Sequence, residues 1–188
     1  KMTQMIESVL TYTRSELNSE EETTMSLTSF LSAIVSDYED QGKQVYFNDN
    51  LTKQLDKGTS IFGGKRSKLN IIEEDTRRVL AKIRPLSLQR AIENLIENSL
   101  KYGRKAIVSL QYNSKFAYIN IDDESISMDE KTLKELTGPF KRGPNASFID
   151  GVGLGLTIVS TIAEQHGGKI FFEKTNTGLK TILKISRV

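Results

Sequence analysis

Two asparagines and a lysine lie at helical spacing within residues 86–102, and their side chains suit a cation and a phosphate. Asn94, Asn98, Lys101 and Tyr102 follow one border of the apolar stripe of this expected helix. Asparagine is unfavourable inside helices because its amide competes for backbone hydrogen bonds. An amide oxygen is a hard ligand suited to Mg²⁺, and a lysine one turn later can meet a phosphate. The functional interpretation is a magnesium and phosphate site, and the alternative is a pair of solvated asparagines.

A glycine-rich loop with the sequence Gly-Val-Gly-Leu-Gly-Leu occupies residues 151–156 and leads directly into an expected helix. Backbone N–H groups of such a loop can close on a phosphate, and the helix N-terminus adds a favourable dipole. No Lys-Ser or Lys-Thr pair follows the glycines, which excludes a P-loop. No strand leads directly into them, which excludes the Rossmann arrangement. The loop fits either another kind of phosphate-binding element or a tight turn.

Four segments together resemble the sequence boxes of sensor histidine kinases. Residues 94–103 (NLIENSLKYG) resemble the N box, 138–143 (GPFKRG) the F box and 151–159 (GVGLGLTIV) the second glycine box, and 164–168 (EQHGG) resembles the usual sequel. Their order and spacing agree with the family over residues 86–187. The resemblance implies the ATPase fold shared with DNA gyrase and the mismatch-repair ATPases, an α/β sandwich with a mobile lid over the nucleotide.

One motif departs from the family pattern. The family has an aspartate that accepts a hydrogen bond from the adenine amino group, followed by two alternating glycines. Counting back from Phe140 assigns Asp123 to this position, with Asp122 as the alternative, and puts Ser125 and Ser127 in place of the glycines. Serine carries a Cβ and resists positive φ. We therefore expect weaker nucleotide binding or a reshaped adenine pocket, and the alternative is a site that no longer binds nucleotide.

The resemblance also implies a role for each matching residue. Asn98 would hold the Mg²⁺ that bridges the ATP phosphates, Asn94 and Lys101 would line the same wall, and Arg142 would neutralise phosphate charge; these four form the catalytic set. In the hydrolysing relatives a glutamate at the Asn94 position activates water, whereas an amide cannot take a proton, so Asn94 favours phosphoryl delivery to an imidazole. A lid over residues 138–155 would close on the triphosphate. The implied nucleotide contacts are Asn98, Lys101, Tyr102, Asp123, Ser125, Ser127, Phe140, Gly151, Gly153, Leu154, Gly155, Leu156 and Thr181.

Helices must position most of these side chains. Apolar periodicity predicts helices over residues 86–102 and 154–165, and another over 30–38 with Thr28 or Ser29 as its cap. On the first of these, Glu97 and Lys101 have the spacing of a helical ion pair. A short helix is predicted over residues 129–136.

Strands alternate with these helices. Runs at residues 106–112 and 116–122 flank Asn113-Ser114 and predict a β-hairpin. Further strands are predicted at residues 44–48, 78–83, 169–173 and 180–185. Residues 51–76 show no periodicity and predict a surface loop. The expected fold class is α+β, a two-layer α/β sandwich in which helices cover one face of a mixed sheet.

The N-terminal part predicts a separate unit. Apolar residues recur at three- and four-residue spacings over residues 2–17, which predicts an amphipathic helix. It resembles the second helix of the family's dimerisation and phosphoacceptor hairpin. We therefore divide the chain into residues 1–24, part of that hairpin, and residues 25–188, the catalytic ATP-binding domain. The family's acceptor histidine lies on the first helix, which would precede Lys1, and the one histidine present, His166, fits a structural or surface role at a helix end.

Composition limits the alternatives. A net charge of +2 and 27% charged residues give no electrostatic argument for nucleic acid, and the absence of cysteine excludes disulfides and thiolate metal sites. No apolar run is long enough to cross a bilayer. With the resemblance, the expectation is the cytoplasmic domain of a membrane-anchored bacterial sensor, homodimeric at full length. Its expected partners are Mg²⁺ with ATP or ADP, a phosphoacceptor hairpin of its own or its dimer partner's, and a cognate response regulator.

The predicted function is an ATP-dependent protein histidine kinase of a two-component system, acting on a histidine outside this chain. His166 lies roughly 16 Å along its helix from Gly155, too far to reach the phosphates. One alternative is a catalytically silent nucleotide-binding or scaffold domain, which Ser125 and Ser127 favour. The other is a serine kinase of the anti-sigma type, which shares the boxes but lacks a preceding dimerisation helix.

Overall fold

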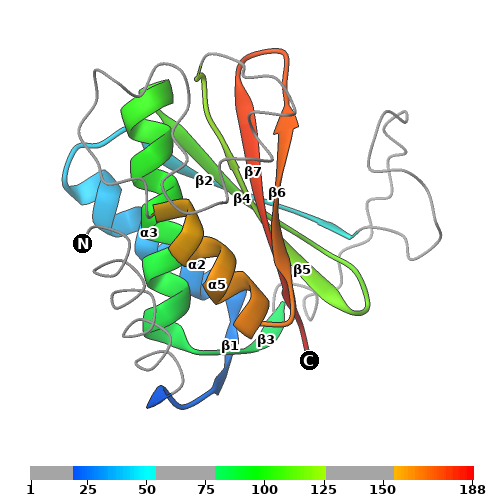
Figure 1. The fold of residues 1–188 in the computed structure, drawn as a ribbon. Helices are drawn as coiled ribbons and strands as arrows, with labels where there is room; N and C mark the ends of the chain where they lie inside the picture. The colour runs from blue at the N-terminus through cyan, green and yellow to red at the C-terminus, as the bar shows by residue number, and fades with distance from the viewer. Residues whose placement is uncertain (1–18, 54–78, 126–154) are drawn as a thin grey trace, which may run out of the picture.

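A mixed sheet of five strands forms one of the two layers seen in the computed structural model, which describes residues 19–53, 79–125 and 155–188 (Figure 1). The strand order within these ranges is β2-β4-β5-β7-β6. β2 pairs with β4 in parallel, and the other neighbours are antiparallel. The strands are β2 (Val45–Lys53), β4 (Ala106–Tyr112), β5 (Phe116–Asp122), β6 (Lys169–Lys174) and β7 (Leu179–Ser186).

The helices α2 (Leu27–Asp40), α3 (Pro85–Gly103) and α5 (Gly155–Gln165) form the second layer on one face of this sheet (Figure 1). Below them, β1 (Thr23–Ser26) and β3 (Leu80–Ile83) pair as a separate antiparallel ribbon, with Thr23 opposite Ile83. β3 leads straight into α3, so this ribbon fixes where the longest described helix begins.

The core lies between the two layers because each layer presents one apolar face. Alternation along β4 and β5 turns Val108 and Ile119, among others, toward the helices, where both are buried. The β4–β5 turn is closed by Asn113, whose Oδ1 accepts hydrogen bonds from the N–H groups of Lys115 and Phe116 at 3.0 and 2.8 Å. From α3, the predicted apolar stripe is buried as expected: Leu88, Ala91, Ile92, Leu95 and Ser99.

The predicted fold class is confirmed, and the hairpin and the helices over residues 86–102 and 154–165 agree with α3 and α5 to within one residue at each end. The strands predicted at residues 78–83, 169–173 and 180–185 agree with β3, β6 and β7 to within two residues. Apolar periodicity predicts these helices and strands well because one face of each is buried against the other layer.

Two local expectations were wrong, and one strand was not predicted. The helix predicted over residues 30–38 begins at Leu27, and its cap is Ser26, whose side chain accepts from the Ser29 N–H at 3.4 Å. β2 runs to Lys53, so the loop predicted over residues 51–76 starts inside a strand that pairs with β4. Thr23–Ser26 belongs to a strand although its sequence is polar, because β3 supplies a partner.

Other predictions concern residues outside the described ranges. They are the N-terminal helix over residues 2–17, the short helix over 129–136 and the lid over 138–155 except Gly155. The division at residue 24 stays a prediction. No helix that the structure describes is long and apolar enough to span a bilayer.

The residue that directly follows α3 holds an unfavourable backbone conformation. Arg104 has φ 66°, the one positive φ among the described residues other than glycine. A residue with a Cβ costs about 1 kcal/mol in this region. We therefore expect Arg104→Gly to raise the free energy of unfolding by about 0.5–1 kcal/mol, measured by urea denaturation.

Gly42 gives the matched control for this measurement. Its φ is 71°, and a Cβ at this position would meet no atom within 4 Å, so only the backbone conformation opposes a substitution. Gly42→Ala should lower the free energy of unfolding by about 1 kcal/mol. Loss of stability in Arg104→Gly would mean that the arginine side chain stabilises the fold by more than its backbone conformation costs.

Candidate nucleotide-binding site

An open groove of about 630 Å³ runs along α3 on the border that carries the two asparagines. Among the described residues it is lined by Lys43, Gln44, Asn94, Glu97, Asn98, Leu100, Lys101 and Arg104. Three predicted site residues, Asn94, Asn98 and Lys101, are thus brought to one surface. The lining carries three cationic side chains against one carboxylate, which favours an anionic ligand.

The ion pair in this groove differs from the predicted one. Glu97 Oε1 lies 3.0 Å from Nζ of Lys43, which belongs to the connection between α2 and β2, and among the described residues Glu97 forms no ion pair with Lys101. Lys101 instead lies 5.8 Å from the centroid of the Tyr102 ring. Within the described part of the chain Lys101 therefore keeps its charge available to the groove, as a phosphate-binding lysine requires.

Asn94 has a defined amide orientation. Its Nδ2 donates to the Arg90 carbonyl at 2.7 Å, so Oδ1, the atom that could bind a cation, points away from the helix backbone. A Cβ built on Gly155 would lie 3.0 Å from this Oδ1 and 3.9 Å from Asn98 Nδ2. The first residue of α5 therefore sits against the asparagine pair, and the absence of a side chain leaves their polar atoms uncovered.

Asp123, the predicted adenine-binding residue, lies in a tight turn directly after β5 and is only 7% exposed. Its N–H donates to the Leu179 carbonyl at 2.8 Å, and its Oδ1 accepts from the N–H groups of Ser125 and Leu179 at 2.9 and 3.3 Å. Both bonds engage Oδ1, so neither uses Oδ2. These bonds fix the orientation of the Asp123 carboxylate, and both of them, from described residues, are made to the same oxygen.

Two glycines allow this turn to approach its neighbours. A Cβ on Gly103, the last residue of α3, would lie 2.8 Å from the Asp123 Cβ, and one on Gly178 would lie 2.2 Å from the Asp123 carbonyl oxygen. Real Cβ atoms do not tolerate such distances, so both positions require glycine. The Asp123 turn thus packs directly against the end of the helix that carries Asn98 and Lys101.

The alternative aspartate is placed differently. Asp122 belongs to β5, and its Oδ1 lies 3.4 Å from the Nζ of Lys180 on the neighbouring strand β7. Burial raises the pKa of Asp122 above its ordinary value, and Lys180 opposes that rise. Asp122 already has a protein partner, and this arrangement favours Asp123 as the residue open to a ligand.

Ser125 does not show the expected strain. Its φ is not positive, since Arg104 is the one described non-glycine residue with that property. The side chain is buried, at 5% exposure, and its Oγ has no hydrogen-bond partner among the described residues. A buried hydroxyl without a partner is unfavourable by about 1–3 kcal/mol, so this group is suited to meet a ligand or a water. Ser127 lies outside the described residues.

Of the remaining predicted nucleotide contacts, some lie in the described part of the chain and others lie outside it. Thr181 is buried on β7 opposite Ile121, and Leu156 packs on the core from α5. Tyr102 is half-buried at the end of α3. Phe140, Arg142, Gly151, Gly153 and Leu154 lie outside the described ranges.

Sequence reasoning missed Lys43, Gln44 and Arg104. Lys43 and Gln44 reach the groove from the connection between α2 and β2, and nothing in their local sequence distinguishes them. Arg104 could have been considered, because it follows the predicted helix directly.

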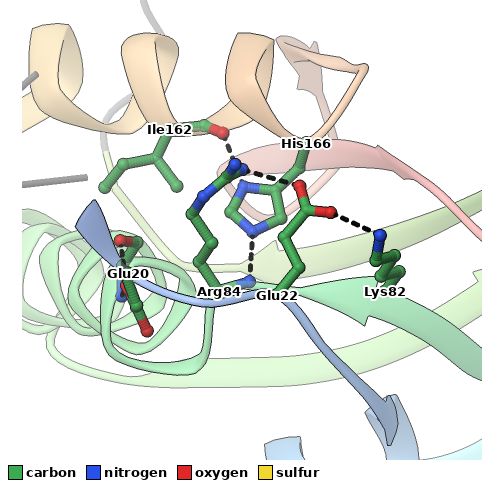
Figure 2. Close-up of polar contacts among 7 residues, drawn as sticks. Glu20, Glu22, Lys82, Arg84, Ile162 and His166 are labelled. Atoms are coloured by element: carbon green, nitrogen blue, oxygen red, sulfur yellow. Dashed lines mark hydrogen bonds and ion pairs between the residues drawn. The ribbon is translucent and has the colours of Figure 1, made fainter. Parts of the chain in front are cut away.

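His166 has a structural role, as predicted (Figure 2). Its Nε2 accepts from the Arg84 N–H at 3.0 Å, so Nδ1 carries the proton and donates to the Ile162 carbonyl at 2.8 Å. The side chain is buried at the end of α5, and both ring nitrogens are occupied. His166 is therefore not available as a phosphoacceptor in this fold.

The fold and the groove define the class of protein, and sequence comparison agrees. The family profile described as histidine kinase-, DNA gyrase B-, and HSP90-like ATPase matches residues 83–187, more than half of the chain. The chain belongs to this ATPase family. The domain that it carries is the catalytic ATPase domain of sensor histidine kinases.

Curated relatives are sensor kinases. The chain is 35% identical to sensor histidine kinase GtrS of Pseudomonas aeruginosa over 107 residues, covering 56% of this chain and 22% of that protein. It is 27% identical to sensor protein KdpD of Mycobacterium tuberculosis over 146 residues, covering 76% of this chain and 17% of that protein. The chain thus spans about a fifth of the length of these relatives.

Solved structures show the same fold. The catalytic domain of histidine kinase ThkA aligns with a TM-score of 0.62 at 17% identity, covering 89% of this chain and 98% of that one. The histidine kinase domain of the E. coli osmosensor EnvZ aligns with a TM-score of 0.57 at 23% identity, covering 87% of each chain.

The first prediction from this site concerns the unpaired Ser125 hydroxyl. Ser125→Ala should raise the free energy of unfolding of the nucleotide-free chain by about 1 kcal/mol, because a buried unpaired group is removed. The same change should weaken adenine-nucleotide binding about three- to tenfold, by calorimetric titration, if the hydroxyl meets the ligand. Ser125→Gly should bring no gain in affinity, and tighter binding would contradict the unstrained backbone.

The second prediction concerns the pH dependence of stability. Burial lowers the pKa of His166 below its ordinary value of 6.5; Arg84 also lowers it, and the Ile162 carbonyl, Glu20 and Glu22 oppose the shift. Below pH 6.5 the unfolded chain binds a proton that the folded chain refuses, so stability should fall as the pH drops toward the folded-state pKa. The slope should approach about 1.4 kcal/mol per pH unit at most, measured by urea denaturation.

His166→Gln provides the comparison for this pH series. A glutamine amide can accept from the Arg84 N–H and donate to the Ile162 carbonyl without titrating. The difference in stability between the two proteins should therefore change with pH only below about pH 7. Parallel stability curves would mean that His166 is not held neutral.

Proposed function

We propose that this domain binds Mg·ATP and transfers the γ-phosphoryl group to a histidine other than His166, as the catalytic part of a two-component sensor kinase. The observation that carries the proposal is the contact between Asn94 and the first residue of α5. This contact lies beside Asn98, the predicted magnesium ligand, and Lys101, so these groups and a helix N-terminus are close together. These are the groups that a triphosphate with its cation requires.

Asn98 and Asn94 are the proposed magnesium-facing residues. Amide oxygens suit this hard cation, and Asn94 Oδ1 is directed away from its own helix. The described residues contain no cluster of three or more His, Cys, Asp or Glu side chains that could hold a metal. This donor set fits Mg²⁺ in particular, because the ion usually keeps waters and phosphate oxygens as its other ligands. When bound, the ion neutralises charge on the transferring phosphoryl group.

The groove supports transfer over hydrolysis. Neither asparagine can accept a proton from water, and the two nearby carboxylates already have protein partners. Glu93 Oε1 accepts from Gln89 Nε2 at 2.8 Å, and Glu97 pairs with Lys43. An acceptor imidazole is already nucleophilic and needs only positioning and charge neutralisation, which Lys101 and the helix N-terminus would provide.

The base end of the nucleotide is proposed to lie at the Asp123 turn. The carboxylate is held by Ser125 and Leu179 through Oδ1, which leaves Oδ2 to accept from an adenine amino group. Ser125 Oγ and the buried Thr181 are further polar groups proposed to contact the nucleotide. Arg142, Phe140 and the glycine loop are proposed to complete the site from the lid.

The partners follow from the same proposal. The acceptor would be a phosphoacceptor hairpin of the same protein or of its dimer partner, and the phosphoryl group would pass to a cognate response regulator. The full-length protein is proposed to be a homodimeric, membrane-anchored sensor with this domain in the cytoplasm.

Phosphotransfer in trans tests the proposal. The chain is incubated with Mg²⁺, ATP labelled at the γ-phosphate and a separate hairpin that carries the family's acceptor histidine. Acid-labile label should appear on the hairpin and not on this chain. Asn98→Ala should reduce magnesium-dependent ATP affinity at least about tenfold and abolish labelling, because a cation ligand is lost. Glu93→Gln, on the same helix, should label the hairpin normally.

Each other outcome selects a different function. ATP binding without label on the hairpin would favour a catalytically silent nucleotide-binding domain. Acid-stable label on a serine would favour an anti-sigma-type kinase. Acid-labile label on this chain that disappears in His166→Gln would overturn both the transfer proposal and the structural role of His166.

A further inference from the structure

The helix that carries the nucleotide-site residues begins without a cap of its own. The residue before α3, Arg84, makes no side-chain capping hydrogen bond, and Pro85 follows it. The first N–H groups of a helix have no partner within the helix, and the helix dipole favours an anion there. The N–H groups of Leu86 and Ser87 therefore need acceptors from elsewhere in the chain.

Glu20 supplies them from a segment more than sixty residues earlier. Its Oε1 accepts from the Leu86 N–H at 2.6 Å, and its Oε2 accepts from the Ser87 N–H at 3.0 Å. The Ser87 hydroxyl donates a short bond to the same Oε2. One carboxylate thus satisfies both free N–H groups and the hydroxyl of a residue that is 4% exposed.

The segment of residues 20–22 also contacts the place where the start of α3 meets the end of α5, which we call the α3–α5 junction (Figure 2). Glu22 forms ion pairs with Lys82 and Arg84, each at 2.9 Å. The Arg84 N–H donates to His166 at the end of α5, whose ring in turn donates to the Ile162 carbonyl. Residues 20–22 therefore meet both the start of α3 and, through Arg84, the end of α5.

Strand pairing fixes this segment in register. Thr23 lies opposite Ile83 in the β1–β3 ribbon, and the pairing continues to Ser26 opposite Leu80. Glu20 thus reaches the first turn of α3 from a defined position.

We propose that Glu20 is a positioning residue for the nucleotide site. Leu86 and Asn94 are eight residues apart on one helix, about 12 Å along its axis, so an axial shift at the first turn moves Asn94 and Asn98 as well. α5 is held at its far end by the same junction, while its first residue, Gly155, sits against Asn94. Residues 20–22 therefore set the relation between the two helices whose contact forms the groove.

This inference rests on the proposed nucleotide site for its functional consequence, but its structural part does not need nucleotide. If Glu20 were only a stabilising cap, its removal would lower the melting temperature without moving Asn94 and Asn98.

The test compares Glu20→Ala, Glu20→Gln and Glu21→Ala in the whole chain. Glu21 is exposed and takes no part in the junction, so it is the matched control. Three quantities are measured at a temperature where every variant is folded. They are hydrogen exchange of the Leu86 and Ser87 N–H groups, the side-chain amide signals of Asn94 and Asn98 by NMR without nucleotide, and the affinity for Mg·ATP.

Glu20→Ala should speed exchange at Leu86 and Ser87 about fivefold or more, since the cap is removed. It should also shift the amide signals of Asn94 and Asn98 and weaken Mg·ATP binding about two- to fivefold, a change within the free-energy range of a lost cap. Glu20→Gln keeps an acceptor oxygen and should recover part of each change, and it serves as the folded variant if the alanine chain unfolds. Glu21→Ala should match the unsubstituted chain.

Faster exchange at Leu86 and Ser87 with unmoved Asn94 and Asn98 signals would overturn the inference, because Glu20 would then be only a local cap. Equal effects of Glu20→Ala and Glu21→Ala would overturn it as well. If the unsubstituted chain fails to bind Mg·ATP, the proposed function fails, whereas the asparagine signals still decide the role of Glu20.

Discussion

The contact between α3 and α5 at Asn94 and Gly155 is the constraint on which the groove depends. α3 is long enough to lay a continuous apolar stripe on the sheet, and this burial fixes the rotation of the helix about its axis. With the rotation fixed, Asn94, Asn98 and Lys101 must fall on the border that faces the start of α5. A side chain on Gly155 would cover the asparagines, so the same glycine allows close packing and keeps polar atoms accessible.

The opposite end of the candidate site depends on a second close contact, between the Asp123 turn and two glycines. The Asp123 turn fits between Gly103 at the end of α3 and Gly178 before β7, and a Cβ at either position would collide with it. Hydrogen bonds to Leu179 tie the turn to β7 as well as to β5. The sheet therefore places the carboxylate, and α3 places the amides and the lysine. Their relative position is set because the sheet and α3 share one core.

The charges around α3 follow the direction of its dipole. Glu20 places a carboxylate at the first turn, where N–H groups have no partner within the helix, and Lys101 and Arg104 place cations at the C-terminal end. The cationic end lies in the groove, where an anionic ligand would offset the concentration of positive charge. The same helix is thus stabilised by a protein anion at its start and presents cations to the groove at its end. His166 lies near the end of α3 that Glu20 caps. There its neutral ring links α5 to the backbone of Arg84 through hydrogen bonds.

The sequence by itself determined the elements with strong periodicity, the α+β class and the family, because these depend on local pattern and on motifs whose residues are close in the chain. It also determined that Asn94, Asn98 and Lys101 share one helix border. Only the tertiary structure decided that Glu97 pairs with Lys43, that a polar segment forms β1, and that Ser125 is buried without strain. It alone showed that Glu20 caps α3. The cap, the ion pair and β1 each join residues that are more than fifty positions apart, so they exist only after the core has brought distant segments together, and no local preference encodes them.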